Sequence, residues 1–309
     1  MPWLITAIIS YFLLAIVFLL DKYLLVQRIP DPKIYAFYIG LISILAVFLI
    51  PFVGFEVPEL KVVLLSLVTG VVFILALFYF FKALRAFEAS RIVPAVGGIL
   101  PLFTLVFVYF ISGGEEVLSL PDFLAFLLLI LGTVLITYRQ DKGLSTQSLK
   151  LSFLAAFLFA LYFILLKYVY LDLSFWSGLI WTRVGAFLAA IFLFLAFLEV
   201  RRELFKKTLT FTFKWSSIFG ATPFLFILTR IGAGLAGLFQ MWAVFLAPFI
   251  GIALINALQG TQYLFLFLLT TLVSLRFPGI LREEISGPIL LQKVLAILLI
   301  SAGIAILTF

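Results

Sequence analysis

Residues 113–137 read GGEEVLSLPDFLAFLLLILGTVLIT, and residues 281–308 read LREEISGPILLQKVLAILLISAGIAILT. Each stretch has a pair of glutamates, a serine and a proline, followed by an apolar segment. Each apolar segment carries one glycine in its last third, Gly132 in the first and Gly303 in the second. This order of features indicates that the chain contains two copies of one unit.

A second pair of stretches supports the repeat. FLLAIVFLLDKY at 12–23 resembles FLFALYFILLKY at 157–168, and both end in Lys-Tyr. The repetition predicts a first half at 1–138, a linker at 139–150 and a second half at 151–309.

The composition predicts a membrane protein. Of the 309 residues, 65% are hydrophobic and 11% are charged, and the mean hydropathy is +1.32. A soluble domain is about half apolar and a quarter charged. The absence of cysteine and histidine excludes disulfides and His/Cys metal sites, so we expect no metal, no cofactor and no enzyme activity. The net charge is +7. Because the basic residues lie between apolar runs, we expect the bilayer and not nucleic acid as the partner.

Apolar segments of membrane-spanning length recur along the chain. The predicted helices are 3–24, 33–53, 61–81, 91–112, 121–138, 150–170, 174–198, 216–243, 248–275 and 288–309. Residues 231–275 carry no charge, and as one helix they would span about 67 Å. We therefore predict a break at LAPFIGIA (246–253), where Pro248 interrupts the helix. The uncharged first segment, without a cleavage site, is expected to remain as a helix.

Five helices in each half give the two halves opposite orientations. The predicted fold is therefore all-α, with ten transmembrane helices as two inverted five-helix repeats around a central cavity. Inverted repeats of this kind are typical of secondary transporters, whose binding site lies near the midplane at the repeat interface.

Two longer stretches resemble a known family. They are YFFKALRAFEASRIVPAVGGILPLFTLVFVYF at 79–110 and LFQMWAVFLAPFIGIALINALQGTQYLFLFLL at 238–269. Both are similar to the EamA-like branch of the drug/metabolite transporter superfamily. The resemblance implies a cavity lined by the third, fourth, eighth and ninth helices, with help from the first and sixth. Members move amino acids, metabolites, nucleotide sugars, drugs or lipid-linked groups. The loop GFEVPELK (54–61) is acidic, whereas that loop is often basic in the family.

The basic residues predict an orientation. Loops after odd-numbered helices carry Lys22, Arg28, Lys33, Lys82, Arg85, Arg91, Arg139, Lys142, Lys150, Arg201, Arg202, Lys206, Lys207, Lys214, Arg276, Arg282 and Lys293. The other face has only Lys61 and Lys167. The positive-inside rule then places both termini outside the cytoplasm in a multi-pass protein of the cytoplasmic membrane. The family resemblance implies termini inside, so the orientation stays open.

The ninth predicted helix has an informative polar pattern. Asn256, Gln259 and Tyr263 are spaced by three and four residues, so they share a helix face, and Gln262 lies beside them. Such side chains could bind a substrate or hold helices together. We favour the substrate cavity, because the stripe occupies the place in its repeat that PAVGGILP (94–101) occupies in the other.

Other polar residues interrupt apolar runs. Arg183 and Arg230 could attract a substrate carboxylate or phosphate, or could snorkel and pair structurally. Lys22 and Lys167 are interfacial anchors or gating residues. Tyr79, Gln240 and Trp242 could line the cavity or pack in the core.

The stretch 81–101 combines charges with helix breakers. Lys82, Arg85 and Arg91 predict a short basic turn between the third and fourth helices. The residues Pro94, Gly97, Gly98 and Pro101 predict a hinge that faces the stripe of the ninth helix.

Together these patterns favour a secondary transporter that exports a small metabolite, such as an amino acid or related carboxylate, by alternating access. A flippase for a lipid-linked group and a membrane scaffold are the alternatives. No Asp or Glu lies deep in a predicted helix, which predicts transport without a carboxylate for proton coupling. The fused halves are compatible with a monomer or a homodimer.

Overall fold

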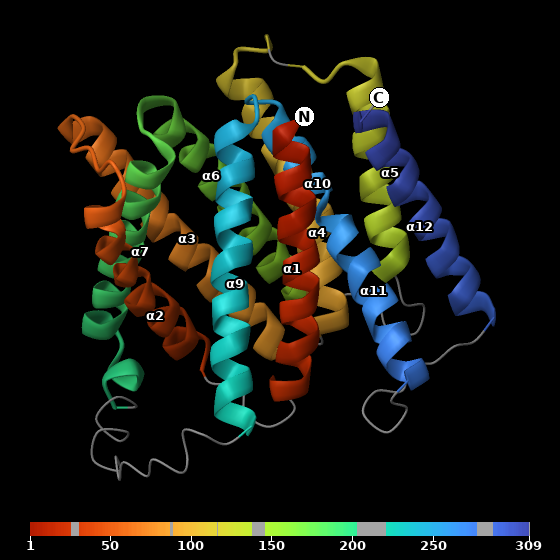
Figure 1. Cartoon of the computed structure of the whole chain (residues 1–309), viewed down its shortest axis with the longest axis horizontal. Coiled ribbons are helices and arrows are strands. Elements are labelled where there is room, and N and C mark those ends of the chain that lie inside the picture. The colour runs from red at the N-terminus through yellow and green to blue at the C-terminus, as the bar shows by residue number, and fades with distance from the viewer. Residues whose placement is uncertain are drawn as a thin grey trace. The chain divides into compact units, whose positions relative to one another are not determined.

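The computed structural model describes residues 1–25, 31–86, 89–115, 117–137, 146–202, 221–276 and 287–308 (Figure 1). Within these ranges every regular element is a helix. The elements are α1 (Pro2–Leu25), α2 (Pro32–Ser43), the 3-10 helix η1 (Ile44–Phe52), α3 (Leu60–Ala86), α4 (Ala89–Ile111), α5 (Leu120–Thr137), α6 (Thr146–Asp172), α7 (Phe175–Ala196), α9 (Ala221–Leu246), α10 (Gly251–Ala257), α11 (Gln259–Arg276) and α12 (Gly287–Thr308).

The helices are those of a membrane-embedded protein. In the described ranges, five spans are long and apolar enough to cross a bilayer: Pro32–Phe52, Leu60–Ala86, Leu149–Asp172, Phe175–Ala196 and Gly251–Leu269. Shorter apolar helices lie within α1, α4, α5, α9 and α12. Each of the ten predicted apolar segments therefore contains a helix. Because a helix pairs its own backbone groups, it can lie in hydrocarbon without exposing them.

The helix boundaries confirm one prediction and correct another. The predicted break at 246–253 is confirmed, because α9 ends at Leu246 and α10 begins at Gly251. The predicted basic turn at 82–91 is wrong in extent, because α3 continues to Ala86 and α4 begins at Ala89. Lys82 and Arg85 therefore lie on the last turns of α3. Charged side chains at a helix end can reach water while the backbone stays helical.

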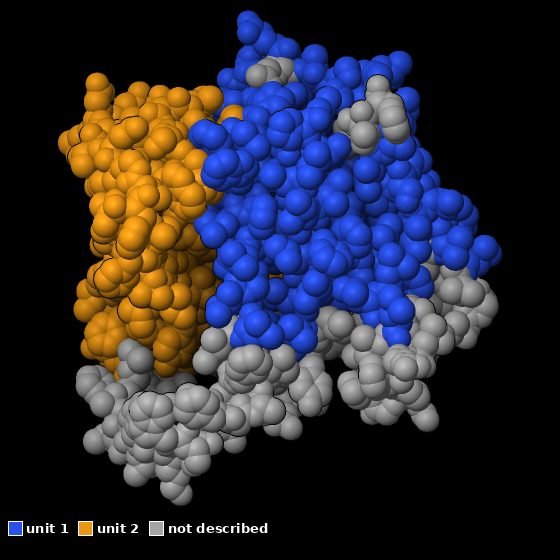
Figure 2. Space-filling view, viewed as in Figure 1, with its two compact units in different colours: residues 1–28, 108–143, 215–309 blue, residues 29–107, 144–214 orange. Residues whose placement is uncertain are grey.

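The chain forms two compact units (Figure 2). Unit 1 comprises 1–28, 108–143 and 215–309, and unit 2 comprises 29–107 and 144–214. Each unit contains segments from both predicted halves. The boundary predicted at 139–150 concerns repetition along the chain and not contact in space, so it stays a prediction.

In unit 1, α1 packs on α9 and α5 packs on α12, with each pair running antiparallel (Figure 1). The α5–α12 contact is reciprocal. A Cβ on Gly132 would lie 2.6 Å from Ile300 Cγ1, and a Cβ on Gly303 would lie 2.9 Å from Leu129 Cγ. Ile300 follows Leu129 by 171 positions, as Gly303 follows Gly132. Equivalent residues of the two helices therefore make equivalent contacts.

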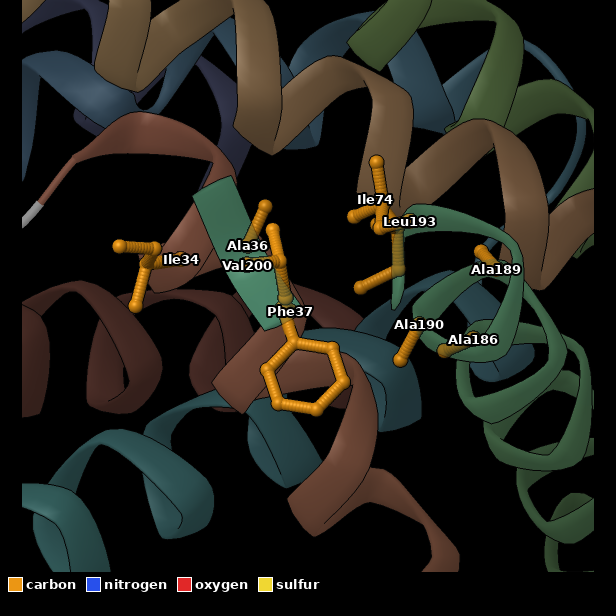
Figure 3. Packing of buried hydrophobic residues seen from close by; sticks show 9 residues of the cluster. All are labelled: Ile34, Ala36, Phe37, Ile74, Ala186, Ala189, Ala190, Leu193 and Val200. Atoms are coloured by element: carbon orange, nitrogen blue, oxygen red, sulfur yellow. The ribbon is translucent and has the colours of Figure 1, made fainter. Parts of the chain in front are cut away.

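Unit 2 has its apolar core between α2, α3 and α7 (Figure 3). The buried cluster consists of Ile34, Ala36, Phe37, Ile74, Ala186, Ala189, Ala190, Leu193 and Val200. Small residues bring α3 and α7 very close. A Cβ on Gly70 would overlap the backbone of Thr182, and a Cβ on Gly185 would lie 2.7 Å from Leu67 Cα. Dispersion contacts between closely approaching backbones are a main source of helix association in membranes.

Candidate functional site

A helix break inside unit 1 gathers most of the predicted polar residues. After α10 ends at Ala257, Leu258 leaves the helix and α11 begins at Gln259. The side chains that belong to this region are called the amide cluster and are Tyr11, Gln240, Asn256, Gln259, Gln262 and Tyr263. They come from α1, α9, α10 and α11.

Tyr11 connects α1 to the break. Its hydroxyl donates to the carbonyl of Ile255 at 2.9 Å, and its side chain also shares a hydrogen bond with Gln240. In an unbroken helix that carbonyl accepts from the amide four residues later. At this break the hydroxyl of a neighbouring helix also reaches it.

The four residues predicted on the ninth helix lie around the break. Asn256 is fully buried, and Gln262 and Tyr263 are also buried. Gln259 Nε2 donates to the Tyr263 hydroxyl at 3.3 Å, and Tyr263 lies near Tyr11. The helix predicted at 248–275 is divided, because α10 ends at Ala257 and α11 begins at Gln259; that these residues share one face stays a prediction. They remain in one region of unit 1.

The break is stabilised by local hydrogen bonds. The Leu258 carbonyl accepts both the backbone amide of Thr261 at 2.8 Å and its hydroxyl at 2.7 Å. Next to Thr261, Gly260 lies so close to Thr133 of α5 that a Cβ would overlap the hydroxyl. The polar backbone at the break is therefore enclosed by protein. Broken helices in membranes are tolerated where protein or a water-filled cavity surrounds them.

In unit 2 a charged side chain lies among aromatic rings. The guanidinium of Arg183 on α7 lies 5.4 Å from the ring centroid of Phe73 on α3. Phe73 in turn packs on Tyr162 of α6, with ring centroids 4.9 Å apart. Arg183 also lies near Tyr162 and Tyr170. These four residues form the cation–aromatic cluster. An aromatic face attracts a cation electrostatically, so it stabilises the guanidinium where little water is present.

The other predicted lining residues have separate positions. Lys167 on α6 is 6% exposed, which is too buried for an interfacial anchor at the surface of unit 2. Tyr79 on α3 packs on Phe78 and lies beside Lys82. Trp242 is half-buried and lies two residues after Gln240, so the two side chains leave α9 in nearly opposite directions.

For some of the predicted site residues the structure describes the backbone but not the side chain. The side chains of Lys22, Arg230 and Pro94 fall outside the described residues. Gly97, Gly98 and Pro101 are buried in α4, which is helical from Ala89 to Ile111. The hinge and its predicted position opposite the ninth helix stay predictions.

Sequence reasoning missed several members of the two clusters. Tyr11 was overlooked in an apolar run, although Ser10 and Tyr11 are adjacent polar residues there. Ser10 also connects α1 to α9, because its hydroxyl donates to the Ala236 carbonyl at 2.8 Å. Phe73, Tyr162 and Tyr170 carried no usable signal, because aromatic residues make up 17% of the chain.

The comparisons with known proteins define the fold and not the activity. No family model and no curated protein matches the chain. Solved structures do match, 29 chains in all. One is a crystal structure described only as that of a protein, with a TM-score of 0.63 and 18% identity. The match covers 99% of this chain and 95% of that one. The fold is therefore shared over the full length of a protein with little sequence similarity.

Proposed function

We propose that the protein is a secondary transporter that moves a small metabolite by alternating access, with the amide cluster as part of its substrate site. The observation that carries the proposal is the α10–α11 break, lined by buried amide and hydroxyl groups. Discontinuous helices with polar groups inside the membrane are typical of transporter binding sites. Apart from packing, such an arrangement supplies donors and acceptors that a solute can use.

The packing within the units supports an inverted repeat. If helix positions are numbered one to ten, α1 and α9 are the first and eighth, and α6 and α3 are the sixth and third. Both pairs pack together, as a repeat of five helices requires. The reciprocal contacts of Gly132 and Gly303 between antiparallel helices are what a two-fold relation between inverted halves would produce. The resemblance to EamA-like transporters agrees with this organisation.

The chemistry of the clusters supports an amphipathic anionic substrate, such as an amino acid or related carboxylate. In unit 1, the amide cluster offers uncharged hydrogen-bonding groups. In unit 2, taken by itself, Arg183 offers a positive charge that suits a carboxylate. Export, residence in the cytoplasmic membrane and a functional monomer or homodimer are parts of the same proposal.

Uptake into proteoliposomes tests the function. The purified protein would be reconstituted, and pooled radiolabelled or isotopically labelled metabolites would be followed by mass spectrometry. The expected result is counterflow of at least one small anionic or zwitterionic solute. The matched variants are Asn256→Leu, which should lose uptake, and Tyr109→Phe on the exposed surface, which should keep it. Movement of a fluorescent lipid analogue without any solute would instead identify a flippase, and no movement of either would reject transport.

A further inference from the structure

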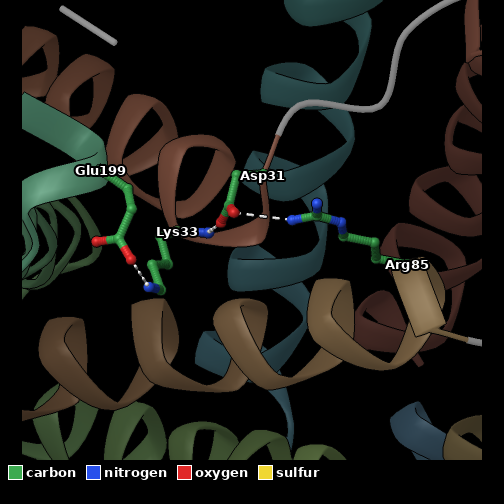
Figure 4. Close-up of polar contacts among 4 residues, drawn as sticks. All are labelled: Asp31, Lys33, Arg85 and Glu199. Atoms are coloured by element: carbon green, nitrogen blue, oxygen red, sulfur yellow. Dashed lines mark hydrogen bonds and ion pairs between the residues drawn. The ribbon is translucent and has the colours of Figure 1, made fainter. Parts of the chain in front are cut away.

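Three helix ends of unit 2 meet in a charged network (Figure 4). Asp31, which precedes α2, accepts a hydrogen bond from Arg85 at the end of α3, with 2.8 Å between the atoms. Lys33 on the first turn of α2 pairs with Glu199 after α7 at 2.9 Å. Lys33 Nζ also lies 4.6 Å from the ring centroid of Phe197. The network therefore connects α2, α3 and the segment that follows α7.

Among the described residues, the cations at this end exceed the carboxylates. The described residues here include five cations, Lys33, Lys82, Arg85, Arg201 and Arg202, which are called the basic end. They face two carboxylates, Asp31 and Glu199. Each carboxylate already pairs with one cation. Arg202 is close enough to Glu199 to affect that group electrostatically, but forms no ion pair within the described ranges.

One of these cations, Arg201, has a side-chain nitrogen without a hydrogen-bond partner among the described residues. Its Nε is buried and has no hydrogen-bond acceptor among the described residues. A buried charged donor without an acceptor is unfavourable. The Arg201 side chain as a whole is part-exposed, so an anion can approach its outer nitrogens and offset the positive charge of the basic end.

The surface beside the arginines is apolar. Phe192, Leu195 and Leu198 are 65%, 64% and 56% exposed. Phe192 and Leu195 lie on the last turns of α7, which ends at Ala196, and Leu198 follows the extended Phe197. A soluble anion would gain nothing from this apolar surface, whereas a lipid could place its chains there and its phosphate at the arginines.

We propose that the basic end binds the phosphate of an anionic lipid headgroup, with Arg201 and Arg202 as its direct contacts and Phe192, Leu195 and Leu198 against its chains. Basic groups at the ends of membrane helices recognise anionic lipids by this combination of charge and apolar contact. The proposal requires only that the protein is embedded in a membrane, and it does not depend on the transport function.

Thermal unfolding of the full-length protein in detergent tests the site. Phosphatidylglycerol should raise Tm by about 2–5 °C more than phosphatidylcholine does, since binding to the folded state alone stabilises it. In the double variant Arg201→Gln/Arg202→Gln most of this difference should disappear. Lys61→Gln, which removes an exposed cation at the opposite end of α3, should keep it. An unchanged difference in the double variant would overturn the proposal.

Two further measurements cover the remaining outcomes. Native mass spectrometry of the wild-type protein should show phosphatidylglycerol retained in preference to phosphatidylcholine, and equal retention would reject the site even if the double variant did not fold. Glycerol 3-phosphate should leave Tm unchanged at the concentrations that saturate the lipid effect. An equal rise with glycerol 3-phosphate would show a site for soluble phosphate and would contradict a lipid site.

Discussion

The two units of this protein bury polar groups by different means. Among the described residues of unit 1 the buried polar side chains are uncharged, and hydrogen bonds such as that from Tyr11 to Ile255 satisfy backbone groups at a helix break. In unit 2 a charged side chain, Arg183, lies over the aromatic face of Phe73. Amides and hydroxyls need only local partners inside a membrane, whereas a guanidinium also needs electrostatic stabilisation over a wider volume. In the proposed transporter, unit 1 would therefore recognise hydrogen-bonding groups and unit 2 negative charge.

The units also differ in how closely their helices approach. In unit 2 the close neighbours of Gly185 are backbone atoms of Leu67, whereas in unit 1 the nearest neighbour of Gly132 is Cγ1 of the Ile300 side chain. A side chain can rotate away from an added methyl group, but a helical backbone cannot. Close packing is therefore more restrictive in unit 2.

The largest expected effect is a loss of folded protein when the glycine at the α3–α7 contact is replaced by alanine. The same substitution at two other glycines provides the comparison. Gly185→Ala should greatly reduce the yield of folded protein, because the methyl group would overlap the α3 backbone. Gly132→Ala should cost about 1–3 kcal/mol, because Ile300 can shift. The control Gly54→Ala adds a methyl group where no atom lies within 4 Å and should leave Tm unchanged. Size-exclusion yield and Tm measure all three, and equal losses at Gly185 and Gly132 would remove the difference between the units.

A second prediction concerns the charge in unit 2. Arg183→Leu should lower the uptake of anionic solutes at least about tenfold, which corresponds to 1.4 kcal/mol in the transport barrier. Stability should stay equal or increase, because removal of a charge from a membrane helix is favourable in itself. Arg183→Lys should retain part of the uptake. Loss of Tm together with uptake of every solute would indicate that Arg183 is only structural.

The third prediction tests the break in unit 1. Tyr11→Phe removes the hydroxyl that donates to the Ile255 carbonyl, and we expect a loss of about 0.6–2 kcal/mol in unfolding free energy. Uptake of the solute identified in the proteoliposome assay should fall as well, because the break loses one of its supports. Tyr109→Phe is the control, since Tyr109 is 47% exposed. If both variants behaved alike, the Tyr11 hydrogen bond would have no role at the break.

The smallest effect is expected at the charged end of unit 2. The hydrogen bond from Lys33 lowers the pKa of Glu199 below its usual 4.5. A carboxyl group with a lowered pKa stabilises the folded state at higher pH, and this contribution disappears as the pH falls through the folded pKa. Glu199→Gln should therefore lower Tm slightly at pH 7 and not at all once the pH is well below the folded pKa of this carboxyl group. A Tm difference that grew on acidification would contradict the assigned sign.

The helix α4 and the α10–α11 pair show that helix breaks are hard to place from sequence. Pro94, Gly97, Gly98 and Pro101 indicated a disturbed helix, yet α4 is continuous from Ala89 to Ile111. The break occurs instead at Leu258, which is neither proline nor glycine. Pro94 and Pro101 are the sixth and thirteenth residues of α4, so each removes an intrahelical hydrogen bond without ending the helix. The prediction at Pro248 was confirmed, because this proline ends α9 within an apolar stretch too long for one crossing.

The candidate site was predicted in part. Asn256, Gln259, Gln262 and Tyr263 were found because amides and hydroxyls are conspicuous in an apolar chain. Tyr11 was missed, because its contribution is a hydrogen bond to a residue 244 positions away. Arg183 was found from its charge, but its aromatic surroundings were not.

The sequence by itself determined that the chain lies in a membrane, that it is helical and where most helices begin and end. Those properties follow from local composition, because hydrocarbon admits only long apolar segments whose backbone groups pair internally. Only the tertiary structure decided that the ninth predicted helix breaks at Leu258 and that Arg183 lies over Phe73. A break is stable only where other helices supply hydrogen bonds and enclosure, and a cation stays inside only where aromatic faces meet it. Both depend on contacts between residues distant in the chain, which local composition does not encode.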